Sequence, residues 1–358
     1  MNIRSSTKKF EKWKSCRIAL VKKDIGIKHQ EMAASPFPFF RATFYRWLQL
    51  WEKECGKEAA APKVLAVGDL HVENFGTWRD QEGRLIWGVN DFDEAYPMPY
   101  TIDLVRLATS AYLAATEEHL ELKLRAASKA ILQGYLDGIK SRGLPFVLEE
   151  DHKWLRQIAL NRLRDPVRFW SRLEHLPQFT GPLPEIVKRK LEAELPEPGL
   201  PYLKKRRIAG LGSLGHFRVV VLAQWRGGWI AREAKALCHS SCLWQNGQTG
   251  GQILYQEIIS RAVRVPDPFL RIHEGMLYRR LAPDCSRILL SSLPKDHDEV
   301  RLLRAMGFET ANIHLGSRSA VAAIQRDLER RPKDWLHRAA RRMAKAVVRD
   351  WEEWARTH

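Results

Sequence analysis

The stretch Val67–Gly76, VGDLHVENFG, places Asp, His, Glu and Asn in one short loop directly after the apolar run Lys63–Val67. The apolar run predicts a short buried strand. Polar side chains that follow a strand can reach solvent while their backbone is held rigidly, which suits catalytic chemistry. The same residue types also favour turns, so this loop alone is as consistent with a plain turn as with an active site.

The composition predicts a folded globular protein of about two domains. The chain has 358 residues, of which 45% are hydrophobic. Its five cysteines are scattered, which indicates reduced thiols rather than a disulfide framework. No run approaches the roughly 18 apolar residues that a membrane span needs, and the N-terminal segment lacks an apolar signal core. We therefore expect a cytoplasmic protein without a membrane partner.

The net charge of +17 favours anionic partners, which include nucleotides, nucleic acid, acidic metabolites and membrane surfaces. The charge does not choose among them, and solvated basic helix faces explain part of it. Cys238, His239 and Cys242 lie close together in the sequence, but no second Cys/His cluster completes a tetrahedral site. A structural zinc site is therefore not favoured.

Hydrophobic periodicity predicts an α+β chain that changes from a mainly helical pattern to a strand-rich pattern near residue 200. The expected helical segments are 8–60 (broken at 35–38), 101–175, 252–263 and the tail from 318, and the expected strands lie in 63–95, 208–237 and 275–283. A turn at 80–83 separates the two strands of 63–95, and a Pro-rich stretch at 181–201 is the best boundary. We expect a mainly helical part over 1–200, a β-rich part over 201–290 and C-terminal helices over 291–358.

A second polar cluster, Asn90–Glu94, ends the second strand of 63–95. If the two strands form an antiparallel hairpin, Asp69 and Asn74 come near Asp91, with Asp93 beside them. Like charges crowded at one sheet edge are costly unless protons or a cation neutralise them. Hard oxygen ligands suit Mg²⁺. The alternative is a solvated acidic hairpin.

Together, GDLHVENFG and the following VNDFDEA resemble the active-site hairpin of aminoglycoside phosphotransferases and other kinase-like enzymes. The resemblance implies that Asp69 is the catalytic base and that Asn74 and Asp91 are magnesium ligands. It makes Asp93 a further ligand candidate and His71 a supporting loop residue. In TIDLVRL (residues 101–107), which is similar to the helix start of that family, Asp103 would brace the catalytic loop. The alternative is a carboxylate that only interacts with the N-terminal end of the helix dipole.

A glycine-rich segment, AGLGSLGHFR (residues 209–218), contains G-x-G-x-x-G. A Rossmann fold would continue into a helix, whereas the apolar run that follows these glycines predicts a strand. The order of strand, glycine loop, strand, turn and strand with a lysine is typical of the nucleotide-covering half of kinases. The residues predicted to contact the nucleotide phosphates are Gly210, Gly212, Ser213, Gly215 and Lys235. Arg232 is the alternative to Lys235, and Glu257 is either the ion-pair partner of that lysine or a surface glutamate.

The two kinase-like halves occur in reversed order, so the fold class expected is a kinase-like two-lobe α+β fold in circularly permuted order. The ordered motifs ASPFPFFR (residues 34–41), VGDLHVENFG, VNDFDEAYPMPYTIDLVRLA, GLGSLGHFRV and REAKAL also identify the chain as resembling bacterial domain-of-unknown-function family 2252. Arg41 belongs to the first motif, where it either contacts phosphate or braces the acidic hairpin.

These features favour an ATP- and Mg²⁺-dependent phosphotransferase whose hydroxyl or amine acceptor the sequence does not identify. Nucleotidyl transfer and a non-catalytic nucleotide-binding regulator are the alternatives. A nucleic-acid-binding protein is less favoured, although the basic C-terminal helix supports it. The basic residues of that helix are Arg338, Arg341, Arg342, Lys345 and Arg349. An amphipathic basic helix is more often a solvated face packed on a core.

Overall fold

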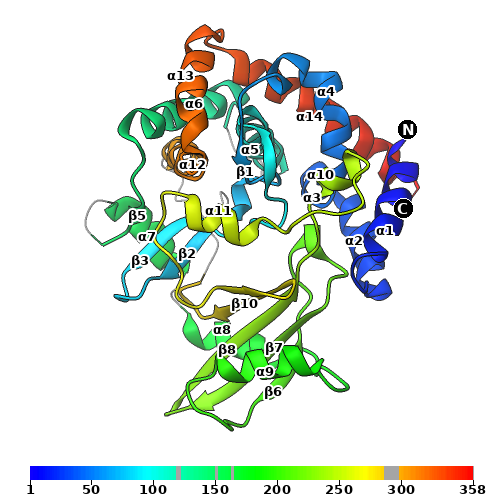
Figure 1. Ribbon diagram of the computed structural model, residues 1–358, viewed down its shortest axis with the longest axis vertical. Helices are drawn as coiled ribbons and strands as arrows, with labels where there is room; N and C mark the ends of the chain where they lie inside the picture. The colour runs from blue at the N-terminus through cyan, green and yellow to red at the C-terminus, as the bar shows by residue number, and fades with distance from the viewer. Residues whose placement is uncertain (118–121, 150–151, 163–164, 286–297, 358) are drawn as a thin grey trace.

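The computed structural model describes residues 1–117, 122–149, 152–162, 165–285 and 298–357. Helices fill the upper part of the molecule in Figure 1, and an antiparallel sheet with two helices forms the lower part. The architecture is therefore mixed α and β, as the periodicity predicts. The predicted boundary at residues 290 and 291 lies outside the described residues.

The N-terminal segment is helical, as expected, and its break falls at Ser35. Its helices are α1 (Ile3–Ser15), α2 (Lys22–Ala34), α3 (Pro36–Ala42) and α4 (Phe44–Ala59). Ser35 is extended and separates α2 from α3. Pro36 occupies the first turn of α3, where its missing N–H costs no hydrogen bond. The proline pair therefore begins a short helix instead of forming a loop.

The acidic hairpin uses a different first strand from the one predicted. The strand β1 (Lys63–Ala66) pairs with β4 (Tyr96–Pro99), while β2 (Phe75–Arg79) pairs with β3 (Leu85–Val89). The predicted turn at 80–83 is correct, but the strand before it is β2, which follows the polar loop, and not β1, which precedes that loop. Because β1 and β4 lie outside this hairpin, the polar loop connects two separate sheets. A short strand, β5 (Phe146–Val147), extends the hairpin on the β3 side.

Five strands between residues 203 and 281 form an antiparallel sheet in the order β6-β7-β8-β10-β9. Its strands are β6 (Leu203–Arg206), β7 (Arg218–Trp225), β8 (Gly228–Ala236), β9 (Arg271–His273) and β10 (Met276–Leu281). One face packs on α8 (Pro166–Glu174), and the other packs on α9 (Glu185–Ala193). The Pro-rich stretch at 181–201 is therefore a packed segment that contains α9.

Helix α5 (Thr101–Glu117) is buried on nearly every side, against α3, α4, α6, α12 and α14. The helices that follow it are α6 (Leu124–Ser141), α7 (Lys153–Arg162), α10 (Ser241–Gln245), α11 (Tyr255–Arg261), α12 (Asp298–His314), α13 (Val321–Arg330) and α14 (Trp335–Ala355). α12 packs along α6, and α14 packs on α4 and α5. In α14, Arg342 and Arg349 pair with Glu58 and Glu54 of α4 at 3.0 and 3.4 Å.

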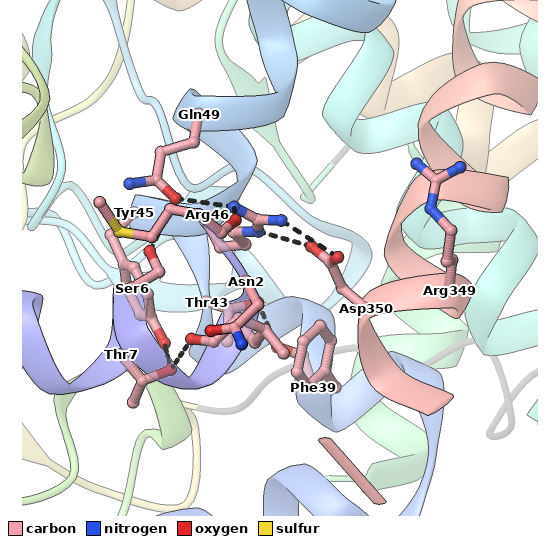
Figure 2. A network of polar contacts seen from close by, with 12 residues as sticks. Asn2, Ser6, Thr7, Phe39, Thr43, Tyr45, Arg46, Gln49, Arg349 and Asp350 are labelled. Carbon is pink, nitrogen blue, oxygen red and sulfur yellow. Dashed lines mark hydrogen bonds and ion pairs between the residues drawn. The ribbon is translucent and has the colours of Figure 1, made fainter. Parts of the chain in front are cut away.

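Polar contacts fix α1 and α14 against α4, as Figure 2 shows. The hydroxyls of Thr7 and Tyr45 lie 2.8 Å apart in a buried position. Arg46 Nε donates to Asp350 Oδ2 at 2.6 Å. Buried polar groups satisfied in this way specify one arrangement of the helices that carry them. These contacts hold α1, which carries Lys14 in its last turn, in one position relative to α4.

Candidate functional site

The loop after β1 is held by a buried carboxylate, Asp103, at the start of α5. Asp103 accepts hydrogen bonds from the backbone N–H groups of Val67 and Gly68, each at 2.8 Å. Its Oδ2 also lies 2.9 Å from His314 Nε2 of α12. Gly68 has φ +85°, and a Cβ there would lie 2.7 Å from the carbonyl oxygen of Glu94. Asp103 therefore has the bracing position that the resemblance implies.

Asp69 follows this brace and is paired with a wholly buried arginine. Arg106 Nε donates to Asp69 Oδ1 at 2.8 Å, and the guanidinium lies 3.9 Å from the centroid of the Phe40 ring. Burial raises the pKa of Asp69 to about 6, and Arg106 offsets this only in part. At neutral pH the carboxylate is therefore mostly ionised but able to accept a proton.

The hairpin brings Asn74 and Asp91 together. Asn90 N–H donates to the Asn74 carbonyl at 2.9 Å, directly beyond the last β2–β3 pair. The Asn74 side chain accepts from the backbone N–H of His71 at 3.0 Å, which closes the turn. His71 Nδ1 accepts from the backbone N–H of Glu73 at 3.2 Å, so His71 caps this turn. The predicted proximity is correct even though the predicted first strand of the hairpin was wrong.

Lys235 of β8 reaches across to the acidic hairpin. Its Nζ lies 2.5 Å from Asp93 Oδ2 and 3.8 Å from Asp91 Oδ1. Burial raises the pKa of Asp93, Asp91 raises it further, and Lys235 opposes both effects. Asp93 Oδ1 is buried and has no hydrogen-bond partner within the described residues. An unpartnered carboxylate oxygen beside a second carboxylate fits a hard cation such as Mg²⁺.

The glycine-rich segment lies against Asp69. Gly210 has φ +77° and precedes a 3₁₀ turn over Leu211–Ser213. A Cβ on Gly212 would lie 3.5 Å from Asp69 Oδ2 and 3.3 Å from the Arg41 carbonyl. Backbone of the loop therefore approaches the carboxylate closely.

The end of the glycine-rich segment is tied to the start of α2. Val21 N–H donates to the Gly215 carbonyl at 2.8 Å, and a Cβ on Gly215 would clash with Ile25. Gly215 lines neither cavity described below, so it packs on α2 and is not placed to contact phosphate.

Two cavities meet at these residues, and Asp91 and Gly210 border both. The larger cavity has a volume of about 740 Å³ and is bordered by Lys235, Arg218 and Arg279. The smaller cavity has a volume of about 60 Å³ and is bordered by Asp69 and residues of α1 and α2. The predicted residues that border at least one of them are Asp69, Asn74, Asp91, Asp93, Gly210, Gly212, Ser213 and Lys235.

Of the two roles left open for Glu257, the structure contains the surface glutamate and not the pair with Lys235. Glu257 pairs with Arg261 of its own helix at 2.8 Å. Tyr255 and Ile258 are the buried residues of α11, so Glu257 is directed away from the cavity. Arg232, the alternative to Lys235, donates to the Glu194 carbonyl at 2.9 Å and lies on the opposite face of β8 from Lys235.

A buried carboxylate, Glu233 of β8, organises the basic wall of the larger cavity. It pairs with Arg207 and Arg279, each at 2.6 Å, and with Arg218 at 3.2 Å. Burial alone would raise the pKa of Glu233, but Arg279, Arg218 and Arg207 outweigh burial and hold it well below its usual value. The sequence analysis missed this cluster, whose signal was a Glu two residues before Lys235 in a predicted strand.

The hairpin carries one further ion pair, since Arg41 Nη1 lies 2.7 Å from Glu73 Oε2. Of the two roles left open for Arg41, the structure therefore contains the bracing contact. The sequence analysis also missed Arg106, whose signal was a basic residue on an apolar helix stripe. All five cysteines are free thiols.

Among the described residues, no three or more His, Cys, Asp or Glu side chains gather as a metal site. A metal at Asp91 and Asp93 would therefore need further oxygen ligands, such as phosphate and water. None of the described helices combines the length and apolar character that crossing a bilayer requires.

Residues 20–154 match the sequence profile of a family described as an uncharacterized protein conserved in bacteria (DUF2252). No curated protein and no solved structure matches the chain. The matched region contains Arg41, the polar loop and the acidic hairpin, whereas the glycine-rich segment and Lys235 lie outside it. Over residues 20–154, the match confirms the resemblance to bacterial domain-of-unknown-function family 2252.

Proposed function

We propose that this chain is an ATP- and Mg²⁺-dependent phosphotransferase with a kinase-like fold in permuted order. The observation that carries the proposal is the contact of Lys235 with Asp91 and Asp93 at the edge of a cavity of about 740 Å³. It joins the sheet that bears the glycine loop to the hairpin that bears the acidic residues. A volume of this size lies within the usual range for small-molecule sites, about 300–1,000 Å³.

In this proposal the sheet β6–β10 is the nucleotide-covering lobe, and the helices around α5 form the other lobe. The sheet follows the acidic hairpin in the chain, whereas in kinases it comes first. Arg4 Nε donates to Thr357 Oγ1 at 2.9 Å, so the two ends of the described chain are adjacent. Adjacent ends make a circular permutation physically tolerable.

The larger cavity would hold the triphosphate. Lys235, Arg218 and Arg279 border it and would neutralise phosphate charge, as would the backbone N–H groups near Gly210. Asp91, Asp93 and Asn74 are the residues that would hold magnesium, and the unpartnered Asp93 Oδ1 fits that role. Magnesium, when bound, supplies charge neutralisation for the transferring phosphoryl group.

Asp69 would orient the acceptor and take its proton. Its pKa of about 6 leaves it ionised at pH 7, and Arg106 fixes its orientation. Asp91 borders both cavities, so an acceptor held near Asp69 and a nucleotide in the larger cavity would meet beside Asp91. This arrangement suits in-line transfer, in which positioning and charge neutralisation supply most of the catalysis.

The substitution Asp91→Asn tests the nucleotide and metal assignment. We expect the Mg²⁺-dependent thermal shift with ATP to disappear and turnover to fall by about a thousandfold, because metal-ligand removal costs several kcal/mol. Release of ADP, measured with a coupled assay, separates phosphoryl transfer from nucleotidyl transfer, which releases pyrophosphate. The matched control is Glu82→Ala, an exposed carboxylate at the far end of the same hairpin. An unchanged Mg²⁺-ATP shift in Asp91→Asn would contradict the proposal.

The substitution Asp69→Asn tests the base. We expect nucleotide binding to persist and transfer to fall by about 10²–10⁴-fold, the usual contribution of a general base. In the wild type, the rate should fall as the pH drops through about 6, because the Asp69 carboxylate then becomes protonated. Full transfer activity in Asp69→Asn, measured at several pH values, would remove Asp69 from this role.

A further inference from the structure

The smaller cavity is bordered by two buried lysines, Lys14 and Lys28, that form no ion pair within the described residues. Lys14 of α1 keeps 7% of its surface exposed, and Lys28 of α2 keeps 3%. Within the part of the chain that the structure describes, neither ammonium group has a hydrogen-bond or ion-pair partner; Lys14 lies 5.5 Å from the Phe10 ring centroid. Lysine is rarely buried without a partner, because removing an ammonium group from water is costly.

The carboxylates near these lysines are already engaged by other groups. Asp69 is held by Arg106, and Asp93 is held by Lys235. Asp91, which also borders the smaller cavity, lies 3.8 Å from Lys235 Nζ.

Two further acidic neighbours of Lys28, Glu94 and Glu11, are also engaged by other groups. Glu94 accepts from Ser241 N–H at 2.6 Å and from Ser241 Oγ at 2.7 Å. Glu11 lies 2.7 Å from His29 Nε2. A bound anion would therefore find two cations that the protein has placed and left unpaired.

We propose that the smaller cavity is the acceptor subsite and that it accepts a compact hydroxyl compound bearing a carboxylate or phosphate group. Lys14 and Lys28 would hold the anionic group and direct the hydroxyl toward Asp69. The acceptor role rests on the proposed phosphotransferase function, whereas the anion site does not.

The size and charge of the cavity restrict the acceptor. A volume of about 60 Å³ holds about four to six water-sized centres, which suits the anionic end of a small acid. Two buried ammonium groups would repel a polycationic acceptor such as an aminoglycoside. The resemblance to aminoglycoside phosphotransferases would then extend to the reacting hairpin but not to the acceptor.

The transfer step balances without a further reactant. The acceptor hydroxyl oxygen forms a bond to the terminal phosphorus of ATP as the bond from that phosphorus to the bridging oxygen breaks. The hydroxyl proton passes to Asp69, and ADP leaves with the electron pair of the broken bond. The anionic group of the acceptor takes no part in the step.

Proton uptake gives a specific signature of anion binding at Lys28. Burial and Lys14 lower the pKa of Lys28 to about 7, while Glu11, Asp69 and Glu94 raise it in part. His216 also faces this region, and burial holds its pKa well below the usual value, so it is neutral at pH 8. A bound anion favours the protonated lysine, so binding at pH 8 should take up a proton from the buffer.

Calorimetric titration of the full chain with inorganic phosphate, in two buffers of different ionisation enthalpy, measures both affinity and proton uptake. We expect Lys28→Met and Lys14→Gln each to weaken phosphate binding by at least about tenfold, the value of a charge-assisted contact. Proton uptake should disappear in Lys28→Met. The matched controls are Lys23→Met and Lys12→Met, exposed lysines on the same two helices. Wild-type affinity and proton uptake in both test variants would overturn the site.

Acceptor profiling then separates this inference from the proposed function. With Mg²⁺-ATP, small hydroxy acids and sugar phosphates should be phosphorylated, and neutral sugars and aminoglycosides should not. Phosphorylation of only neutral or cationic acceptors would overturn the acceptor subsite while leaving a phosphotransferase. Lysine-dependent phosphate binding without any Mg²⁺-ATP binding would keep the anion site and reject the proposed function.

Discussion

Lys235 and Lys28 are equally buried, each with 3% of its surface exposed, but only Lys235 contacts carboxylates of the described chain. Lys235 contacts two aspartates, and the arginines beside it surround Glu233. Lys28 and its neighbour Lys14 have no such partner among the described residues. The larger cavity is therefore bordered by cations that carboxylates of the protein pair, while the smaller cavity is bordered by Lys28, whose charge changes near pH 7.

This difference has a physical consequence for ligand binding. A paired cation keeps its position and charge when no ligand is present, so it is preorganised for a highly charged ligand such as a triphosphate. An unpaired buried cation is destabilising until an anion arrives, so it couples ligand binding to protonation. Substitutions that remove one member of each set test whether the two walls differ in this way.

The largest effect on stability is expected when the arginines that border the larger cavity lose Glu233, the carboxylate they share. Glu233→Gln leaves Arg207, Arg218 and Arg279 without their shared anion and should destabilise the fold by about 3–5 kcal/mol. Urea unfolding at pH 7 measures the loss, with Glu185→Gln, an exposed glutamate on α9, as the control. A change below about 1 kcal/mol would show that the arginines do not depend on Glu233.

A substitution at Lys28, beside the smaller cavity, should change stability in the opposite direction. Lys28→Met should stabilise the free protein by a few kcal/mol near pH 6.5, because the buried charge is removed. The pKa of Lys28 is about 7 in the folded state against 10.5 when unfolded, so the folded state loses its proton first as the pH rises. The penalty is complete below pH 7 and vanishes toward pH 10, and the gain in melting temperature should shrink over the same range. A pH-independent gain, or none, compared with Lys23→Met would show that Lys28 is already compensated.

The smallest effect is expected at Glu257, the carboxylate that does not reach either wall. Glu257→Ala removes only a surface pair with Arg261, worth less than about 1 kcal/mol. We expect the stability and the ATP dependence of turnover to stay at wild-type values. If the chain turns over ATP as proposed, a tenfold rise in the KM for ATP would favour the alternative in which Glu257 pairs with Lys235.

The parts of the site that the sequence predicted correctly are those set by local chain geometry. Asn74 and Asp91 are adjacent because a tight turn and a two-stranded ladder place them so. The first hairpin strand was assigned to 63–67 instead of 75–79, since both segments are short and apolar and periodicity cannot assign their partners. The two roles of Glu257 stayed open because a rotation of α11 by a fraction of a turn decides which side chains face inward.

The parts that the sequence did not predict depend on contacts between distant segments. Lys14 and Lys28 lie on helices with many exposed lysines, and nothing in their local sequence distinguishes the buried ones. Arg106 meets Asp69 only after α5 packs beneath the loop. Burial of a charge is a property of the assembled fold, so a single sequence gives little sign of it.

The hydrogen bond from Val21 N–H to the Gly215 carbonyl connects the helices beside the smaller cavity to the glycine-rich segment. Val21 lies between α1 and α2, which carry Lys14 and Lys28, and Gly215 ends the glycine-rich segment, whose Gly210 borders both cavities. A displacement of either helix would therefore be transmitted to the glycine segment. If both ligands bind as proposed, each should change the affinity for the other by the same factor, because thermodynamic coupling is reciprocal.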